Sequence, residues 1–271
     1  MFEFGVDAAS SGVSLGAADS DLFDQPCLWR VEAAAALGLG SDDMIAVMSP
    51  GPAFPAALRS LESTLPPFLD VIVDLGAGGG GVSEWLRRAT GATVYAIEPA
   101  LGARQAATLA FPDLHVLEGS ADKAPLEDGI ANAVTISGVL SLMPHIDPVI
   151  REVDRLLARG GRFAIADLFS RDAATWSSEP NIFRSVEAVM RKLRHHGFTA
   201  ASVGCGDPVP DPTWAEAARA VDDWIEAHCA DRPGYAEWDT DRRHLREQIA
   251  SGNLIGGCLI AERASTRSRN R

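Results

Sequence analysis

A strand-like apolar run leads directly into a cluster of glycines, and this part of the sequence is best suited to hold a ligand. The run Val-Ile-Val-Asp-Leu at 71–75 is followed by Gly76, Ala77 and the four glycines 78–81. Glycines let a backbone approach a flat ligand closely at the carboxyl end of a strand, so the pattern predicts a nucleotide-type site. Asp74 precedes the first glycine by two residues, where a carboxylate would repel a pyrophosphate and attract a cationic ligand.

The composition of the chain limits the classes of function that can be expected. The chain has 271 residues, 46% of them hydrophobic, and a formal net charge of −13. Nucleic-acid and anionic-membrane binding need clustered cations, so neither partner is expected. The beginning of the chain lacks a basic, apolar leader pattern, and no apolar stretch reaches the length of a membrane span. The four cysteines are widely separated, which disfavours a zinc site and suits a reducing cytoplasm.

Strand-length apolar segments alternate with helix-like segments along the middle of the chain. Five strands are predicted at 71–75, 93–98, 114–118, 133–137 and 162–168, and two more at 198–204 and 254–262. The intervening helices are predicted at 82–89, 103–111 and 147–158, the last with Asp147 as its N-cap. This alternation predicts an α/β fold with a doubly wound, mostly parallel, seven-stranded Rossmann-like sheet.

The regions outside this alternation suggest additions to the sheet. Residues 1–66 are interpreted as an N-terminal arm and helical lid, with helices over 22–39, ended by Gly40, and 54–62. Residues 67–271 form the core, which carries a helix at 182–195. A helical insert at 206–253, with helices over 214–229 and 240–250, is where substrate specificity often resides. The basic tail 264–271 is expected to be disordered.

Four motifs in this order make the chain resemble the class I S-adenosylmethionine-dependent methyltransferases of the small-molecule type. They are Val-Asp-Leu-Gly-Ala-Gly-Gly-Gly at 73–80, Tyr-Ala-Ile-Glu-Pro at 95–99, Glu-Gly-Ser-Ala-Asp-Lys-Ala-Pro-Leu-Glu-Asp-Gly at 118–129 and Leu-Leu-Ala-Arg-Gly-Gly-Arg-Phe at 156–163. The resemblance covers residues 70–204 and the last strand, and it implies S-adenosyl-L-methionine as cofactor.

The resemblance also assigns roles to residues at the ends of four strands. Asp74 would lie near the methionine ammonium, and Glu98 would accept the ribose hydroxyls, as the acid of dinucleotide folds does. The expected cofactor contacts are Asp74, Gly76, Ala77, Gly78, Gly80, Glu98, Pro99, Ser120, Ala121, Asp122, Ser137 and Gly138. Of these, Ser120, Ala121 and Asp122 would hold the adenine edge, and Ser137 and Gly138 would lie where cofactor meets substrate. No metal ligand is expected.

The sequence departs from the family pattern at several positions. Ser120 replaces the Asp of the usual Gly-Asp-Ala, and Ala131-Asn132 replace a common Phe-Asp. Met143-Pro144 occupy the positions where the family often carries His, and His145 follows slightly downstream. His145 is the candidate base for an acceptor hydroxyl, because a neutral hydroxyl must lose its proton to react.

The sequence thus predicts a cytoplasmic enzyme that methylates a small molecule, with a hydroxyl oxygen as the favoured acceptor. Two alternatives stay open. Gly76, Gly78 and Gly81 also satisfy the fingerprint of an NAD(P)-dependent oxidoreductase. A non-catalytic protein of the methyltransferase fold would act through a partner. The oligomeric state does not follow from the sequence.

Overall fold

The computed structural model of the chain describes residues 17–50, 59, 63, 65, 69–172, 176–178, 181–206 and 212–263. Most of the helix predicted over 54–62, the first 16 residues and the tail 264–271 lie outside these described residues. The remaining expectations can be compared with the structure element by element.

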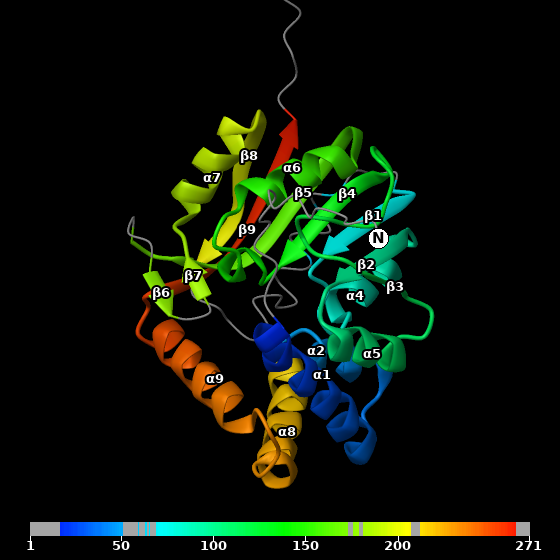
Figure 1. Cartoon of the computed structure of the whole chain (residues 1–271), viewed down its shortest axis with the longest axis vertical. Coiled ribbons are helices and arrows are strands. Elements are labelled where there is room, and N and C mark those ends of the chain that lie inside the picture. The colour runs from blue at the N-terminus through cyan, green and yellow to red at the C-terminus, as the bar shows by residue number, and fades with distance from the viewer. Residues whose placement is uncertain are drawn as a thin grey trace, which may run out of the picture.

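A seven-stranded sheet with the order β3-β2-β1-β4-β5-β9-β8 forms the centre of the molecule (Figure 1). Strands β1 to β5 pair in parallel, whereas β9 pairs antiparallel with both β5 and β8. The predicted doubly wound, mostly parallel sheet is therefore confirmed. The strands are β1 (Val71–Leu75), β2 (Thr93–Glu98), β3 (His115–Glu118), β4 (Ala131–Ser137), β5 (Leu157–Ser170), β8 (Phe198–Gly206) and β9 (Leu254–Arg263).

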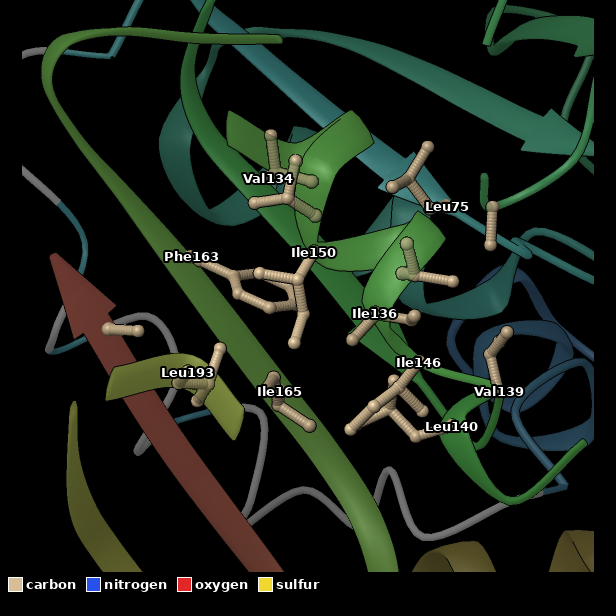
Figure 2. Packing of buried hydrophobic residues seen from close by; sticks show 14 of the residues in the cluster. Leu75, Val134, Ile136, Val139, Leu140, Ile146, Ile150, Phe163, Ile165 and Leu193 are labelled. Carbon is tan, nitrogen blue, oxygen red and sulfur yellow. The ribbon is translucent and has the colours of Figure 1, made fainter. Parts of the chain in front are cut away.

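Helices cover both faces of this sheet because alternate strand residues point to opposite faces. Ile72 packs in one cluster with Leu86 and Phe111, while the adjacent Val73 packs in another with Val149 and Leu193. Figure 2 shows the second cluster, in which side chains from β4 and β5 meet those of the covering helices. The helices between strands are α4 (Gly81–Thr90), α5 (Leu101–Ala110), the short 3₁₀ helix η1 (Leu140–Leu142), α6 (Asp147–Leu156) and α7 (Val186–His195).

The N-terminal helical region differs from its prediction. The helix predicted over 22–39 is α1 (Ala17–Leu37), and it ends before Gly38, not before Gly40. Gly38 has φ +67°, a conformation that glycine adopts without steric cost and that commonly terminates helices. The chain then starts a second helix, α2 (Ser41–Val47), which the sequence interpretation missed.

Two further predictions were wrong in detail around α6 and α7. Asp147 is the first residue of α6, not its N-cap, and its carboxylate instead pairs with Lys192 Nζ at 2.8 Å and His196 Nε2 at 2.9 Å. The helix predicted over 182–195 begins only at Val186. Residues before it form a separate two-stranded sheet, β6 (Trp176–Ser178) with β7 (Asn181–Phe183).

Four helices lie together beyond the ends toward which the parallel strands point (Figure 1). They are α1, α2, α8 (Pro212–Cys229) and α9 (Tyr235–Ala250), and we refer to them as the helical cap. Trp29 of α1 is 2% exposed, and its ring centroid lies 6.2 Å from that of Tyr235 and 5.8 Å from that of Trp238. The described helices include none that is both long and apolar enough to cross a bilayer.

A buried carboxylate joins the cap helices. Asp222 of α8 contacts Arg30 of α1 at 3.4 Å, and Arg242 and Arg246 of α9 at 2.9 Å and 2.6 Å. Arg30 is 7% exposed and also donates to the carbonyl of Val47 at the end of α2. Removing one member of such a buried set leaves an uncompensated charge in the interior. This lowers the stability of the fold more than replacing the whole set by apolar side chains would.

We therefore expect Asp222→Ala to lower the free energy of unfolding by about 3 kcal/mol, because Arg30 would stay buried without its partner. The measurement is urea denaturation followed by circular dichroism. Glu226→Ala, an exposed position on the same helix, is the control and should change the midpoint little. An equal effect of both substitutions would contradict the assigned role of Asp222.

Candidate functional site

The strand order reverses between β1 and β4, which makes this a topological switch point of the sheet. After β1 the chain adds β2 and β3 on one side and then returns to add β4 on the other. In open α/β sheets, ligands bind beyond the carboxyl ends of strands at such a switch point. The glycine loop 76–81 follows β1, Glu98 ends β2 and Ser137 ends β4. The fold thus brings together the sequence-predicted residues that lie at these strand ends.

Glu98 is bound directly to the glycine loop. Its Oε2 accepts the N–H of Gly78 at 2.8 Å, and its Oε1 accepts the N–H of Ala100 at 2.9 Å. The residue is 7% exposed, and this burial raises the pKa of its carboxyl, while the two amide bonds act in the opposite direction. A carboxylate has about four acceptor positions, so roughly two remain for the hydroxyls of a ligand. Pro99 beside it is exposed, and its carbonyl accepts from Arg104.

The glycines of the loop have different reasons to lack a side chain. A Cβ on Gly78 would meet nothing within 4 Å, so this residue borders open space, as a ligand contact requires. A Cβ on Gly80 would instead touch Leu114, Ala107 and Phe111 at 3.0 to 3.3 Å, which makes Gly80 a packing position beside α5. Gly76 and Ala77 fix the start of the loop, since both donate to the carbonyl of Ile97.

The glycines that complete the loop pack against the cap. A Cβ on Gly79 would lie 2.3 Å from Met48 Cε, and one on Gly81 would lie 2.6 Å from the carbonyl oxygen of Ile45. Gly81, the third glycine of the dinucleotide-type fingerprint, is therefore required by the close approach of α2. This explanation removes its diagnostic value for a pyrophosphate ligand.

Asp74 lies beneath the loop. It is 1% exposed, and its carboxylate accepts the hydroxyls of Ser83 at 2.6 Å and Thr135 at 2.8 Å. Burial raises the pKa of Asp74, while the two hydroxyl bonds oppose that effect. The structure therefore shows that Asp74 joins β1 to β4 and α4. Its effect on a cationic ligand stays a prediction.

The residues predicted to hold adenine form a tight turn after β3. Ser120 and Lys123 exchange two backbone hydrogen bonds, of 3.1 and 3.0 Å. The Ser120 hydroxyl donates to Asp122 Oδ1 at 2.5 Å, and Ala121 is buried at the tip. The serine that replaces the family's usual Asp thus orients the neighbouring carboxylate of Asp122.

The residues after β4 lie next to β5. Ser137 is in register with Ala166, and the N–H of Gly138, at φ +68°, donates to the Ala166 carbonyl at 2.9 Å. Both residues are half-buried. His145 lies between η1 and α6 with an exposed side chain. Its role as a base stays a prediction.

Helix α1 contributes residues that the sequence interpretation missed. Asp24 Oδ1 accepts the N–H of Gly102 at 2.6 Å, so α1 caps the first turn of α5 from outside. Helix α5 needs such a partner because Ala100, at its own N-cap position, has no side-chain acceptor. Cys27, one turn further along α1, lies close enough to Arg30 and Glu98 for both to influence it, although burial is the main cause that raises its thiol pKa to about 12. The sequence signal for this contact was Ala100, because an alanine at the N-cap position cannot cap the helix itself and leaves the role to another residue.

The comparisons with known proteins agree with this geometry. The family model described as "Methyltransferase domain" matches residues 73–165. Demethylmenaquinone methyltransferase of Streptomyces avermitilis is 31% identical over 195 residues, which are 71% of this chain and 74% of that protein. Sterol 4-C-methyltransferase strm-1 of Caenorhabditis elegans is 28% identical over 122 residues, or 41% of this chain, and the chain spans only about a third (36%) of its length.

A solved structure shares the fold. Geranyl diphosphate C-methyltransferase from Streptomyces coelicolor, solved with Mg²⁺, geranyl diphosphate and S-adenosyl-L-homocysteine, has a TM-score of 0.54 and 16% identity. The likeness covers 76% of this chain and 75% of that one.

Fold and site together define a doubly wound α/β protein with a nucleotide-type glycine loop at its switch point. The chain belongs to the S-adenosylmethionine-dependent methyltransferase family. Its cofactor is S-adenosylmethionine, which excludes the dinucleotide alternative for this site. The residues present fit this cofactor, because open space at Gly78 faces a buried carboxylate with acceptor capacity for ribose hydroxyls. Within the part of the chain that the structure describes, no group of acidic, His or Cys side chains could hold a metal.

We expect Glu98→Gln to weaken S-adenosylhomocysteine binding by roughly 1–3 kcal/mol, because a charged acceptor of the ribose hydroxyls is lost. Isothermal titration calorimetry measures the change. Glu118→Gln is the matched control, since Glu118 is in register with Glu98 on β3 but its side chain is 79% exposed. An unchanged dissociation constant for Glu98→Gln would show that Glu98 does not contact the ribose.

Proposed function

We propose that this protein transfers the methyl group of S-adenosylmethionine to a carbon atom of a small molecule with an apolar body. The observation that carries the proposal is the 31% identity to demethylmenaquinone methyltransferase over most of both chains. Two other relatives are named C-methyltransferases, one for sterols and one of ubiquinone and menaquinone biosynthesis. The hydroxyl oxygen favoured from sequence has no support among these relatives.

The residues at the strand ends divide the work of holding the cofactor. Glu98 would accept the ribose hydroxyls, and the turn 120–123 would border the adenine. The negative charge of Asp74 beneath the loop favours a cationic ligand. When bound, S-adenosylmethionine supplies an already activated methyl group. The protein's main contribution is then to orient the acceptor and exclude water.

A carbon acceptor places its own demand on the site. A ring carbon becomes nucleophilic when a neighbouring hydroxyl loses its proton, so a base within reach of that hydroxyl would assist the reaction. His145 keeps this candidate role, because it lies on the segment that follows β4. Its exposed position requires the acceptor to cover it in the complex.

We also propose that the helical cap acts as a lid over the site. The sequence led us to expect that the N-terminal helices and the insert 206–253 both close over the site, and Trp29, Arg30 and Asp222 pack the described helices of the two regions against one another. Asp24 fixes α1 to α5 directly beside Glu98. A cap held in this way would have to release that contact for the cofactor to enter or leave.

The lid proposal predicts that Asp24→Ala will speed the release of S-adenosylhomocysteine about fivefold, since an N-cap interaction is worth about 1 kcal/mol. Stopped-flow tryptophan fluorescence measures this dissociation rate. Gln25→Ala, an exposed neighbour on α1, serves as the control. If the dissociation rate of the Asp24 variant equals that of the wild type, the α1–α5 contact does not limit release.

The activity itself is tested with S-adenosylmethionine that carries a deuterated methyl group. We expect the purified protein to transfer the label to a reduced demethylmenaquinone with a shortened side chain, or to a sterol, and mass spectrometry with NMR to locate the label on carbon. Asp74→Asn and Glu98→Gln should lower the rate of labelling. A product labelled only on oxygen would overturn the carbon-acceptor proposal.

A further inference from the structure

A buried carboxylate accepts hydrogen bonds from backbone N–H groups of the segment that follows β4. Asp167, near the carboxyl end of β5, is 2% exposed. Its Oδ2 accepts the N–H of Leu140 at 2.9 Å, and its Oδ1 accepts the N–H of Leu168 at 2.7 Å. The backbone amides of Val139 and Ser141 also donate to this carboxylate. Asp167 therefore binds three successive amides, 139 to 141.

Arg184, which lies between β7 and α7, donates hydrogen bonds to backbone carbonyls of the same segment. Its Nη1 donates to the carbonyls of Leu140 at 2.8 Å and Ile182 at 3.2 Å. Its Nη2 donates to the carbonyls of Met143 at 2.7 Å and Pro144 at 2.8 Å. Burial lowers the pKa of this guanidinium, while the charges of Asp167 and Asp147 oppose that shift.

Asp167 and Arg184 together bind three N–H groups and three carbonyls in the backbone of residues 138–144, which we call the β4 segment. Within it, the N–H of Leu142 also bonds to the Val139 carbonyl at 2.9 Å. The segment therefore presents mainly its side chains, and these are largely apolar. Val139 and Leu140 are buried, with Leu140 beside Ile146 in Figure 2, whereas Leu142 and Met143 remain partly exposed.

The β4 segment is also fixed relative to the cofactor loop. A Cβ on Gly76 would lie 2.4 Å from Val139 Cγ2, so the Val139 side chain packs directly on the Gly76 backbone and leaves no room for another side chain. A segment that touches the first turn of the cofactor loop borders the place where an acceptor must approach. Asp167 cannot act there as a base, because backbone amides occupy its carboxylate and it is almost fully buried.

We infer that Asp167 and Arg184 are positioning residues that hold the β4 segment as a rigid apolar wall, and that the methyl acceptor seats an apolar ring against this wall. The inference rests on the proposed function, which it deepens by naming the surface that recognises the acceptor. The N–H groups of residues 138–143 are all bound within the protein, so an acceptor that needs hydrogen-bond donors would gain nothing from them.

The test uses hydrogen exchange of the full-length protein, saturated with S-adenosylhomocysteine, and menadione as the apolar ring probe. In the wild type, menadione should slow exchange in peptides that cover 138–144. Arg184→Lys keeps the charge but cannot bridge the same carbonyls, so we expect exchange there to quicken about tenfold and the protection by menadione to be lost. Arg191→Lys, at an exposed site on α7, should match the wild type.

Two further measurements separate positioning from folding. The dissociation constant of S-adenosylhomocysteine for Arg184→Lys should stay within about twofold of the wild-type value, since the cofactor contacts lie elsewhere. The urea midpoint of this variant should equal that of the wild type within error. Asp167→Asn should quicken exchange at the same peptides. With an acceptor that the wild type methylates, Arg184→Lys should raise KM more than it lowers kcat.

The inference is overturned if menadione leaves the exchange of 138–144 unchanged in the wild type, or if Arg184→Lys loses cofactor affinity in parallel. Failure of the proposed function has a different signature. In that case no methyl group would reach carbon in the labelling experiment, while menadione would still protect the β4 segment.

Discussion

The glycine loop is the constraint on which the rest of the site depends, because three other parts of the protein approach one stretch of bare backbone. The β4 segment contacts it at Gly76, α2 contacts it at Gly79 and Gly81, and α5 contacts it at Gly80. Only Gly78 faces open space among these positions. The glycines therefore set the spacing between sheet, cap and acceptor side, and one of them leaves room for a ligand. A side chain at any of the packed positions would force a shift in a neighbouring element before it touched a cofactor.

Two buried carboxylates convert this spacing into fixed loop conformations. Glu98 binds the N–H groups of Gly78 and Ala100, and Asp167 binds the amides of the β4 segment. A buried carboxylate is unfavourable unless donors satisfy it, and backbone amides are donors that cannot rotate away. The N–H groups of each loop thus stabilise the buried carboxylate, and the carboxylate in turn fixes the backbone conformation of that loop. The same arrangement occurs on both sides of the β1/β4 switch point, once at the predicted cofactor side and once at the proposed acceptor side.

The sequence predicted the sheet well because buried strands leave a strong apolar signal, and β1 and β2 have the bounds that their apolar runs indicated. It failed where partners distant in sequence decide the outcome. The sequence around Asp147 is typical of an N-cap, but its carboxylate instead pairs with Lys192 and His196. The contact of Asp24 with α5 spans 78 residues, and Ala100 before the helix signals only that a cap is missing, not which residue supplies it. Asp167 did leave a signal, because it is the one acidic residue in an otherwise apolar part of β5, but its role could be recognised only once the position of the β4 segment was known.

The division of the site also explains how one fold accommodates different acceptors. The relatives are named for a sterol, a quinone precursor and geranyl diphosphate, yet the last of these shares the fold at 16% identity. The predicted cofactor contacts lie mainly after β1, β2 and β3, whereas in our proposal the acceptor side would be built from the β4 segment and the helical cap. Substitutions in the second group can change the acceptor without disturbing Glu98 or the glycine loop. In our proposal Asp167 and Arg184 have an intermediate role, since they would maintain the shape of the acceptor wall while its partly exposed side chains, Leu142 and Met143, would determine what that wall recognises.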